Sequence, residues 1–233
     1  MKLQPILLAS LSLISIYLAA LIVLPVINTP LMIFQDDAIA AIVNSALTST
    51  VAALIATPVG SVLAYFTMNG SRRFLTPLIM FPIAIPHTAI GVLLLPLVRG
   101  LGAIDTWIAI VLAMLIVSTP LSFATVRGAL KSMGPELNEF LRPLGVKEYW
   151  VYWFYTRSSL QSHVLGLLLA WLRSFSELGA FLIIAHRPVT AGIYIYESFL
   201  MGGLAYTIGA SLLLVGIAVI FATLLVLIGE RDG

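Results

Sequence analysis

The chain contains no cysteine and few charged residues. The absence of cysteine excludes disulfides and thiolate metal ligands. Only 9% of the 233 residues are charged and 61% are hydrophobic, whereas soluble globular proteins carry about 25% charged residues. Apolar runs of about 18 or more residues recur, each long enough to cross a hydrocarbon core of ~30 Å. The sequence therefore predicts an all-α polytopic membrane protein.

We predict six membrane spans in one domain covering residues 1–233, because no internal repeat or low-complexity segment divides the chain. The spans are expected at residues 6–27, 38–68, 75–98, 104–126, 164–185 and 206–228. The first of them could be a signal peptide or an uncleaved anchor. Since its apolar run exceeds the usual signal-peptide core of about 7–15 residues, we expect an anchor.

Lysine and arginine are distributed unevenly between the two sides of these spans. With the N-terminus inside, two of the twelve basic residues, Arg99 and Arg187, fall outside, and Arg173 lies within a span. The other nine are Lys2, Arg72, Arg73, Arg127, Lys131, Arg142, Lys147, Arg157 and Arg231. Basic residues favour the cytoplasmic side of a membrane protein. We therefore expect a cell-membrane protein with both termini in the cytoplasm.

One connection is much longer than the others, residues 127–163 between spans four and five. Loops longer than about 12–15 residues are usually functional. Glycine and proline at 134–135 and at 143–145 predict two short helices separated by a break, the second over residues 147–155. This pattern indicates a docking surface. Alternatively, the segment lies on the bilayer and its aromatic residues form an interfacial belt; these are Trp150, Tyr152, Trp153 and Tyr155.

The sequence lacks the motifs of an enzyme. There is no G-x-x-x-x-G-K-[ST] nucleotide-binding loop and no H-E-x-x-H pair, and His87, His163 and His186 are far apart along the chain, so a metal site is not expected. Ser211 and His163 could form an intramembrane protease pair. Ser211 lies among Gly209, Ala210 and Gly216, and this setting favours a packed helix interface.

Four segments resemble known transport permeases. Glu139-Phe140-Leu141 followed by Gly145 resembles the "EAA" motif of ABC-importer permease subunits, although both alanines are replaced. FPIAIPHTAIG at 81–91 resembles the third helix of molybdate-type permeases, with His87 in place of a proline, and RSFSELGA at 173–180 resembles their "R-x-x-x-E-F-G-A" segment. HRPVTA at 186–191 and IYESF at 195–199 resemble archaeal molybdate/tungstate permeases.

The resemblance implies a MetI-like permease fold that works as a homodimer. It further implies two copies of a separate ATPase subunit, which bind ATP and Mg²⁺, and an external substrate-binding protein, with no cofactor in this chain and no nucleic acid. The substrate would be a tetrahedral oxyanion, molybdate or tungstate, with sulfate or another oxyanion as the alternative. The contact with the ATPase is expected at Glu136, Glu139, Phe140, Leu141 and Gly145.

Arg173 and Glu177 are two charges inside a predicted span, four residues apart and hence on one helix face. Each charge could be satisfied by a neighbouring helix, or the pair could line a path or gate, which is the usual role of ionisable residues within membranes. The candidate path residues are Pro82, Pro86, His87, Thr88, Arg173, Ser174, Ser176 and Glu177. From another class of transporter, a proton-coupled carrier could use Glu177 as its relay.

Overall fold

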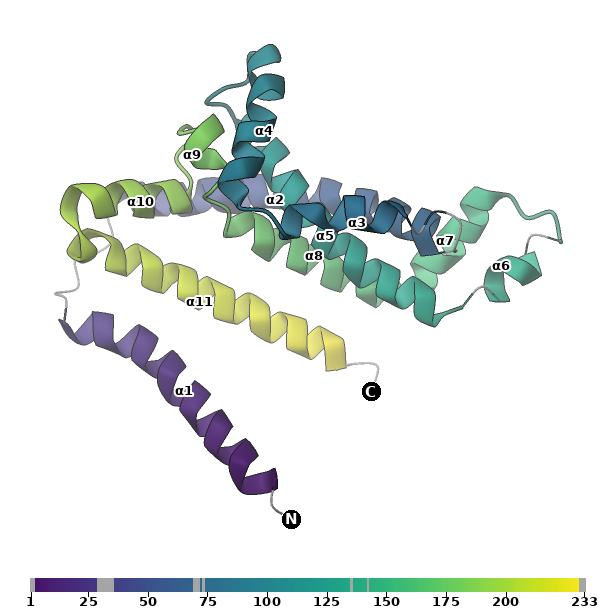
Figure 1. Ribbon diagram of the computed structural model, residues 1–233, viewed down its shortest axis with the longest axis horizontal. Helices are drawn as coiled ribbons and strands as arrows, with labels where there is room; N and C mark the ends of the chain where they lie inside the picture. The colour runs from purple at the N-terminus through teal and green to yellow at the C-terminus, as the bar shows by residue number, and fades with distance from the viewer. Residues whose placement is uncertain are drawn as a thin grey trace.

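The computed structural model describes residues 3–28, 36–68, 72, 74–134, 136–141 and 143–230, and within these ranges the chain is helical, with no β-strand (Figure 1). The helices are α1 (Leu3–Asn28), α2 (Asp36–Met68), α3 (Leu75–Met80), the 3₁₀ turn η2 (Phe81–Ile83), α4 (His87–Gly100), α5 (Trp107–Ser132), α6 (Glu136–Leu141), α7 (Glu148–Ser158), α8 (Leu160–Phe175), α9 (Phe181–Ile184), α10 (Ala191–Gly202) and α11 (Leu204–Gly229).

Within the described ranges, α2, α5 and α11 are long and apolar enough to cross a membrane by themselves. They contain most of the predicted spans 38–68, 104–126 and 206–228. Many large apolar side chains on these helices are exposed in the single chain, for example Leu54 and Val219, each 58% exposed. Outward-facing apolar side chains without a water-soluble coat are typical of helices in lipid.

The predicted span at 75–98 is not a straight helix. The pair formed by α3–η2 and α4 is bent by 110°, and α4 rises away from the long helices (Figure 1). Pro86 has φ −57° and ψ 135°, an extended conformation, and its ring nitrogen carries no hydrogen to continue the helix. Pro86 therefore interrupts the helix within this span.

The prediction of one helix over residues 164–185 is also wrong. α8 ends at Phe175, residues 176–180 leave the helix, and only the short α9 follows. The break frees backbone groups that need new partners. The Glu177 carboxylate supplies one of them, since its Oε1 accepts the N–H of Ala180 at 2.9 Å. Glu177 therefore lies outside α8, and the prediction that it shares a helix face with Arg173 is wrong.

The centre of the bundle is a close approach of α2, α5 and α8 at Ser122. A Cβ on Gly60 of α2 would lie 2.8 Å from the backbone nitrogen of Phe123, and one on Gly166 of α8 would lie 3.1 Å from Ser122 Oγ. Glycine at both positions lets the three backbones pack at this distance. Small residues commonly serve this purpose between membrane helices.

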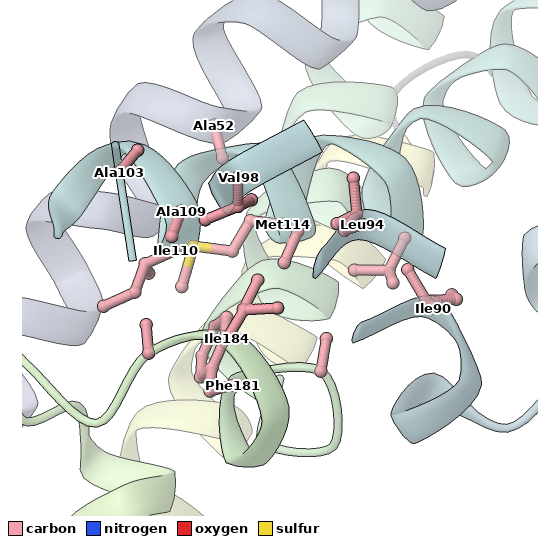
Figure 2. Packing of buried hydrophobic residues seen from close by; sticks show 14 of the residues in the cluster. Ala52, Ile90, Leu94, Val98, Ala103, Ala109, Ile110, Met114, Phe181 and Ile184 are labelled. Atoms are coloured by element: carbon pink, nitrogen blue, oxygen red, sulfur yellow. The ribbon is translucent and has the colours of Figure 1, made fainter. Parts of the chain in front are cut away.

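α9 is held by an apolar cluster between α4 and α5 (Figure 2). Phe181 and Ile184 of α9 are fully buried there with Ile110 and Met114 of α5. The α4 members of the cluster are Ile90, Leu94 and Val98. Since burying one such side chain contributes about 1.5–3 kcal/mol, this cluster fixes α9 even though it is a single turn.

The long connection forms two short helices, as predicted. α6 and α7 are separated by a turn in which Gly145 has φ +73°, a left-handed conformation that favours glycine. Pro135 and Arg142 lie outside the described residues. Of the four aromatic residues proposed as an interfacial belt, only two are exposed: Trp150 and Trp153, at 46% and 43%. Tyr155 is fully buried, and its hydroxyl donates to the carbonyl oxygen of Gly134 at 3.0 Å.

α11 lies against α8. Trp171 of α8 stacks on Phe221 of α11 with a centroid separation of 4.0 Å, and Gln161 donates to the carbonyl oxygen of Ile228. In Figure 1, α1 lies beside α11 and away from the other helices. Exposed apolar side chains such as Leu13 and Ile16 extend along α1. This exposure suits a helix surrounded by lipid.

Candidate functional site

The two helix breaks meet, and their contact depends on glycine. A Cβ on Gly91 of α4 would lie 2.6 Å from the carbonyl oxygen of Ala180, and one on Gly179 would lie 2.9 Å from the Cβ of His87. Distances below 3.0 Å leave no room for a side chain. The start of α4, at His87, therefore packs directly on the non-helical segment 176–180.

A charged cluster fills the junction of these breaks. Glu177 Oε2 accepts from Arg173 Nη2 at 2.8 Å and lies 3.0 Å from His87 Nδ1. With the Ala180 N–H bond, the carboxylate has three partners, and its side chain is 0% exposed. A buried carboxylate is stable only when it is paired and hydrogen-bonded. These contacts provide both conditions.

Arg173 and His87 are also in direct contact. Arg173 can only donate, and its Nη2 lies 2.5 Å and 2.7 Å from Nδ1 and Nε2 of the ring. With the proton on Nδ1, the ring donates to Glu177 and Nε2 faces Arg173 as an acceptor; with the proton on Nε2, Nδ1 accepts from Arg173 instead.

The cluster is more open on its basic side. The side chains of Arg173 and His87 are 20% and 32% exposed, compared with 0% for Glu177. Arg173 Nη1 also donates to the exposed hydroxyl of Ser176 at 3.3 Å, and Thr88 is exposed at the start of α4. The positive charge of Arg173 is balanced by Glu177.

The predicted path residues divide into two groups. His87, Arg173, Ser176 and Glu177 are in mutual contact. Pro86 and Thr88 are exposed beside this cluster, whereas Pro82 and Ser174 are buried. The hydroxyl of Ser174 has no partner within the described part of the chain.

Most of the predicted ATPase contact residues are on the surface. Glu139 and Gly145 are exposed, Phe140 is 68% exposed, and Leu141 is half-buried. Glu136 begins α6, but its side chain lies outside the described residues. An exposed phenylalanine beside an exposed carboxylate is a feature of a surface available to a partner.

The structure has a cavity at the N-terminal end of α2 that the sequence did not indicate. It has a volume of about 510 Å³, and its charged and polar lining residues include Asp37, Asn44, Arg187, Glu197 and Ser198. Asn44 donates to the carbonyl oxygen of Val189, and Asp105 Oδ1 accepts the N–H of His186. The segment between α9 and α10 is thus fixed to α2 and to the turn before α5. These contacts join residues far apart in sequence, so no local pattern signals them.

The described residues offer no group of three or more histidine, aspartate or glutamate side chains that could hold a metal ion. Ser211 donates its hydroxyl to the carbonyl oxygen of Thr207, while His163 contacts Ser61 and Ser159. The serine–histidine pair of the protease hypothesis is therefore not formed in this part of the structure.

Broken helices packed around a polar cluster, inside a chain of outward-facing apolar helices, define a polytopic membrane transport protein. Residues 56–230 match the family "Binding-protein-dependent transport system inner membrane component". The chain belongs to this family.

Similar proteins come from archaea and bacteria. The chain is 34% identical over 198 residues to the molybdate/tungstate transport system permease protein WtpB of Pyrococcus abyssi, covering 82% of this chain and 79% of that protein. It is 30% identical to a probable molybdenum ABC transporter permease protein of Haloferax volcanii, covering 79% and 73% of the two chains. It is 26% identical to the sulfate transport system permease protein CysW of a Synechocystis species, covering 82% and 78%.

Proposed function

We propose that this chain is the membrane permease subunit of an ATP-driven, binding-protein-dependent importer of molybdate or tungstate. The observation that carries this proposal is the 34% identity, over about four fifths of both chains, to a molybdate/tungstate permease. The lower identity to a sulfate permease, 26%, makes sulfate the second candidate.

As such a permease, the chain would form one domain over residues 1–233. It would cross the membrane six times, with both termini in the cytoplasm. The crossings are α1, α2, the bent pair α3–η2 and α4, α5, α8 with the segment after it, and α11. α8 has 16 residues and is about 24 Å long at 1.5 Å per residue. Because this is shorter than a hydrocarbon core of ~30 Å, residues 176–184 complete the fifth crossing.

The α6–α7 module is the contact with the ATPase. The turn at Gly145 connects the two helices, and Glu139 and Phe140 are exposed on α6. Two copies of the permease pair with two ATPase subunits, which bind ATP and Mg²⁺, and with one external binding protein. The permease itself performs no chemistry and requires no cofactor.

The cluster of His87, Arg173, Ser176 and Glu177 lines the transport path or forms a gate in it. The basic side is partly open, and the buried carboxylate limits how tightly an anion is held. The cluster would thus lower the barrier for an oxyanion without trapping it. A proton-coupled carrier that uses the buried Glu177 as a relay is the competing explanation of the same geometry.

Reconstitution tests these alternatives. The permease is placed in proteoliposomes with its cognate ATPase and binding protein, and uptake of molybdate, tungstate and sulfate is measured with and without ATP. We expect uptake of molybdate or tungstate that requires ATP, the ATPase and the binding protein. Uptake that needs no ATPase and collapses with a protonophore would support the proton-coupled carrier. A preference for sulfate would contradict the substrate assignment alone.

A further inference from the structure

A second polar network joins three helices near the α6–α7 module. It consists of Tyr152 on α7, Ser61 on α2, and His163 with Ser159 at the start of α8. Tyr152 Oη lies 2.9 Å from Ser61 Oγ, and Ser61 Oγ lies 2.7 Å from His163 Nε2. His163 Nδ1 lies 2.8 Å from the carbonyl oxygen of Ser159. We call these four residues the α7–α8 hydrogen-bond chain.

For a neutral imidazole, the partners fix the direction of each hydrogen bond in the α7–α8 hydrogen-bond chain. A carbonyl oxygen only accepts, so Nδ1 of His163 carries the proton and donates to Ser159. Nε2 of the neutral ring then accepts from the hydroxyl of Ser61, whose proton is committed to it. Ser61 Oγ in turn accepts from the hydroxyl of Tyr152. Each group then has one role, and Ser61 is bonded to both Tyr152 and His163.

The α7–α8 hydrogen-bond chain is partly enclosed in the protein. Ser61 is 1% exposed, and Tyr152 and His163 are half-buried beside an apolar cluster that contains Val151 and Tyr155. Leaving a buried polar group without its partner is costly. α7 and the start of α8 should therefore shift together rather than separate.

α8 connects the α7–α8 hydrogen-bond chain to the charged cluster. His163 and Arg173 lie on the same helix, ten residues apart, which corresponds to about 15 Å. A helix transmits a displacement at one end to the other because its backbone hydrogen bonds make it rigid. The α7–α8 hydrogen-bond chain thus stands between the surface module and the helix that carries Arg173.

We propose that His163 is the positioning residue that couples movement of α7 to α8, and so to the cluster of Arg173, Glu177 and His87. This inference rests on the proposed function, in which α6 and α7 contact the ATPase. Apolar packing alone could hold α7 in place. The bonds from Ser61 of α2 to Tyr152 and to His163 additionally tie α7 and the start of α8 to the same residue.

The experiment uses the complete transporter, with ATPase and binding protein, in proteoliposomes. Ser61→Ala, Tyr152→Phe and their double variant are compared with two matched controls, Ser162→Ala and Tyr17→Phe. Ser162 is next to His163 but outside the hydrogen-bond chain, and Tyr17 is 63% exposed on α1, outside the α6–α7 module. Complex assembly, ATP hydrolysis and oxyanion uptake are measured separately for each variant.

We expect both single variants to assemble and hydrolyse ATP, while the number of oxyanions imported per ATP falls by about fivefold or more. The double variant should lose no more than the worse single variant, because both changes interrupt one chain. The controls should keep the wild-type ratio. A loss of assembly in proportion to the loss of uptake would show that the bonds only stabilise the fold, and unchanged ratios would overturn the proposal.

A spectroscopic readout tests the geometry independently of transport. In ¹⁵N-histidine-labelled wild-type complex, the signals of His163, assigned with His163→Gln, should show the Nδ1–H tautomer, and Ser61→Ala should shift the Nε2 signal. The other tautomer would overturn the inference even if Ser61→Ala failed to assemble. The proposed function fails separately: in that case the wild-type complex shows no ATP-dependent uptake.

Discussion

We expect neutralisation of Arg173 and neutralisation of Glu177 to destabilise the protein by different amounts. In Arg173→Gln, the Glu177 carboxylate stays at a site where its side chain is 0% exposed. In Glu177→Gln, the remaining guanidinium is 20% exposed and keeps its bond to Ser176. The stranded anion has no access to solvent, whereas the stranded cation has some. Arg173→Gln should therefore be the more damaging change.

The contacts set the size of this difference. Removing one partner of a buried ion pair costs about 3–5 kcal/mol. Glu177 keeps its bonds to His87 and to the N–H of Ala180, so we expect Arg173→Gln to cost about 3 kcal/mol, at the lower end of that range. For Glu177→Gln we expect about 1–2 kcal/mol, because water can partly solvate the guanidinium. The double variant strands neither charge, so it should recover much of the loss in stability.

The assay is a double-mutant cycle with two readouts. Folded yield and thermal unfolding of the detergent-solubilised permease report stability, and ATP-dependent uptake in proteoliposomes reports transport. The double variant should recover stability more than uptake, because its path is less polar. Arg187→Gln, a change at an exposed arginine, serves as the control and should change stability by no more than about 0.5 kcal/mol.

Additive losses would refute this reasoning. If the double variant is destabilised by the sum of the two single variants, Arg173 and Glu177 act through separate partners, and the 2.8 Å contact between them does not contribute. Equal losses in both single variants would show that the difference in exposure is irrelevant. Unchanged uptake in all three would remove the cluster from the transport path.

The long helices follow from the sequence because their cause is local. A run of apolar residues in lipid must satisfy every backbone group within itself, and a helix does so. The predicted spans 38–68 and 206–228 therefore agree within about two residues with α2 and α11. The break at Pro86 was also predictable, since proline removes a donor wherever it occurs.

The break after Phe175 was not predictable because its causes are distant in sequence. Residues 164–185 continue an apolar helical pattern, and Gly179 alone is a weak signal. What stabilises the break is the packing of Gly91 on Ala180 and the bonds from the other break to Glu177. His87 was noted as a replacement for proline. Its contact with both charges depends on the fold.

The α6–α7 module shows the same division between local and distant causes. The turn at Gly145 was predicted from glycine and proline, and its φ of +73° agrees. The aromatic residues of α7 gave no indication of which of them point inward. Tyr155 is buried because its hydroxyl reaches Gly134, a partner that lies across the connection. Tyr152 likewise finds Ser61 on α2, 91 residues away in sequence.

Three further substitutions test other parts of the fold. Gly145→Val should abolish uptake, because a β-branched residue is disfavoured at φ +73°; Gly145→Asn, which tolerates this conformation, should retain it, and assembly measured separately identifies a folding defect. Asp105→Ala removes the acceptor for the N–H of His186 and puts alanine at φ +57°, a conformation that asparagine tolerates better. It should lower the free energy of unfolding by about 1–2 kcal/mol, measured by thermal unfolding, whereas Asp105→Asn, which keeps an acceptor oxygen, should not. Gly91→Ala would place a Cβ 2.6 Å from a carbonyl oxygen at the start of α9, so the two helix breaks must separate. We expect a loss of about 1–3 kcal/mol in stability together with a loss of uptake, since Arg173 and its partners lie at this junction. Gly128→Ala, at a helical position where a Cβ meets nothing within 4 Å, should be neutral or stabilising. Equal stability and full uptake in Gly91→Ala would mean that the contact between the breaks is not required for transport.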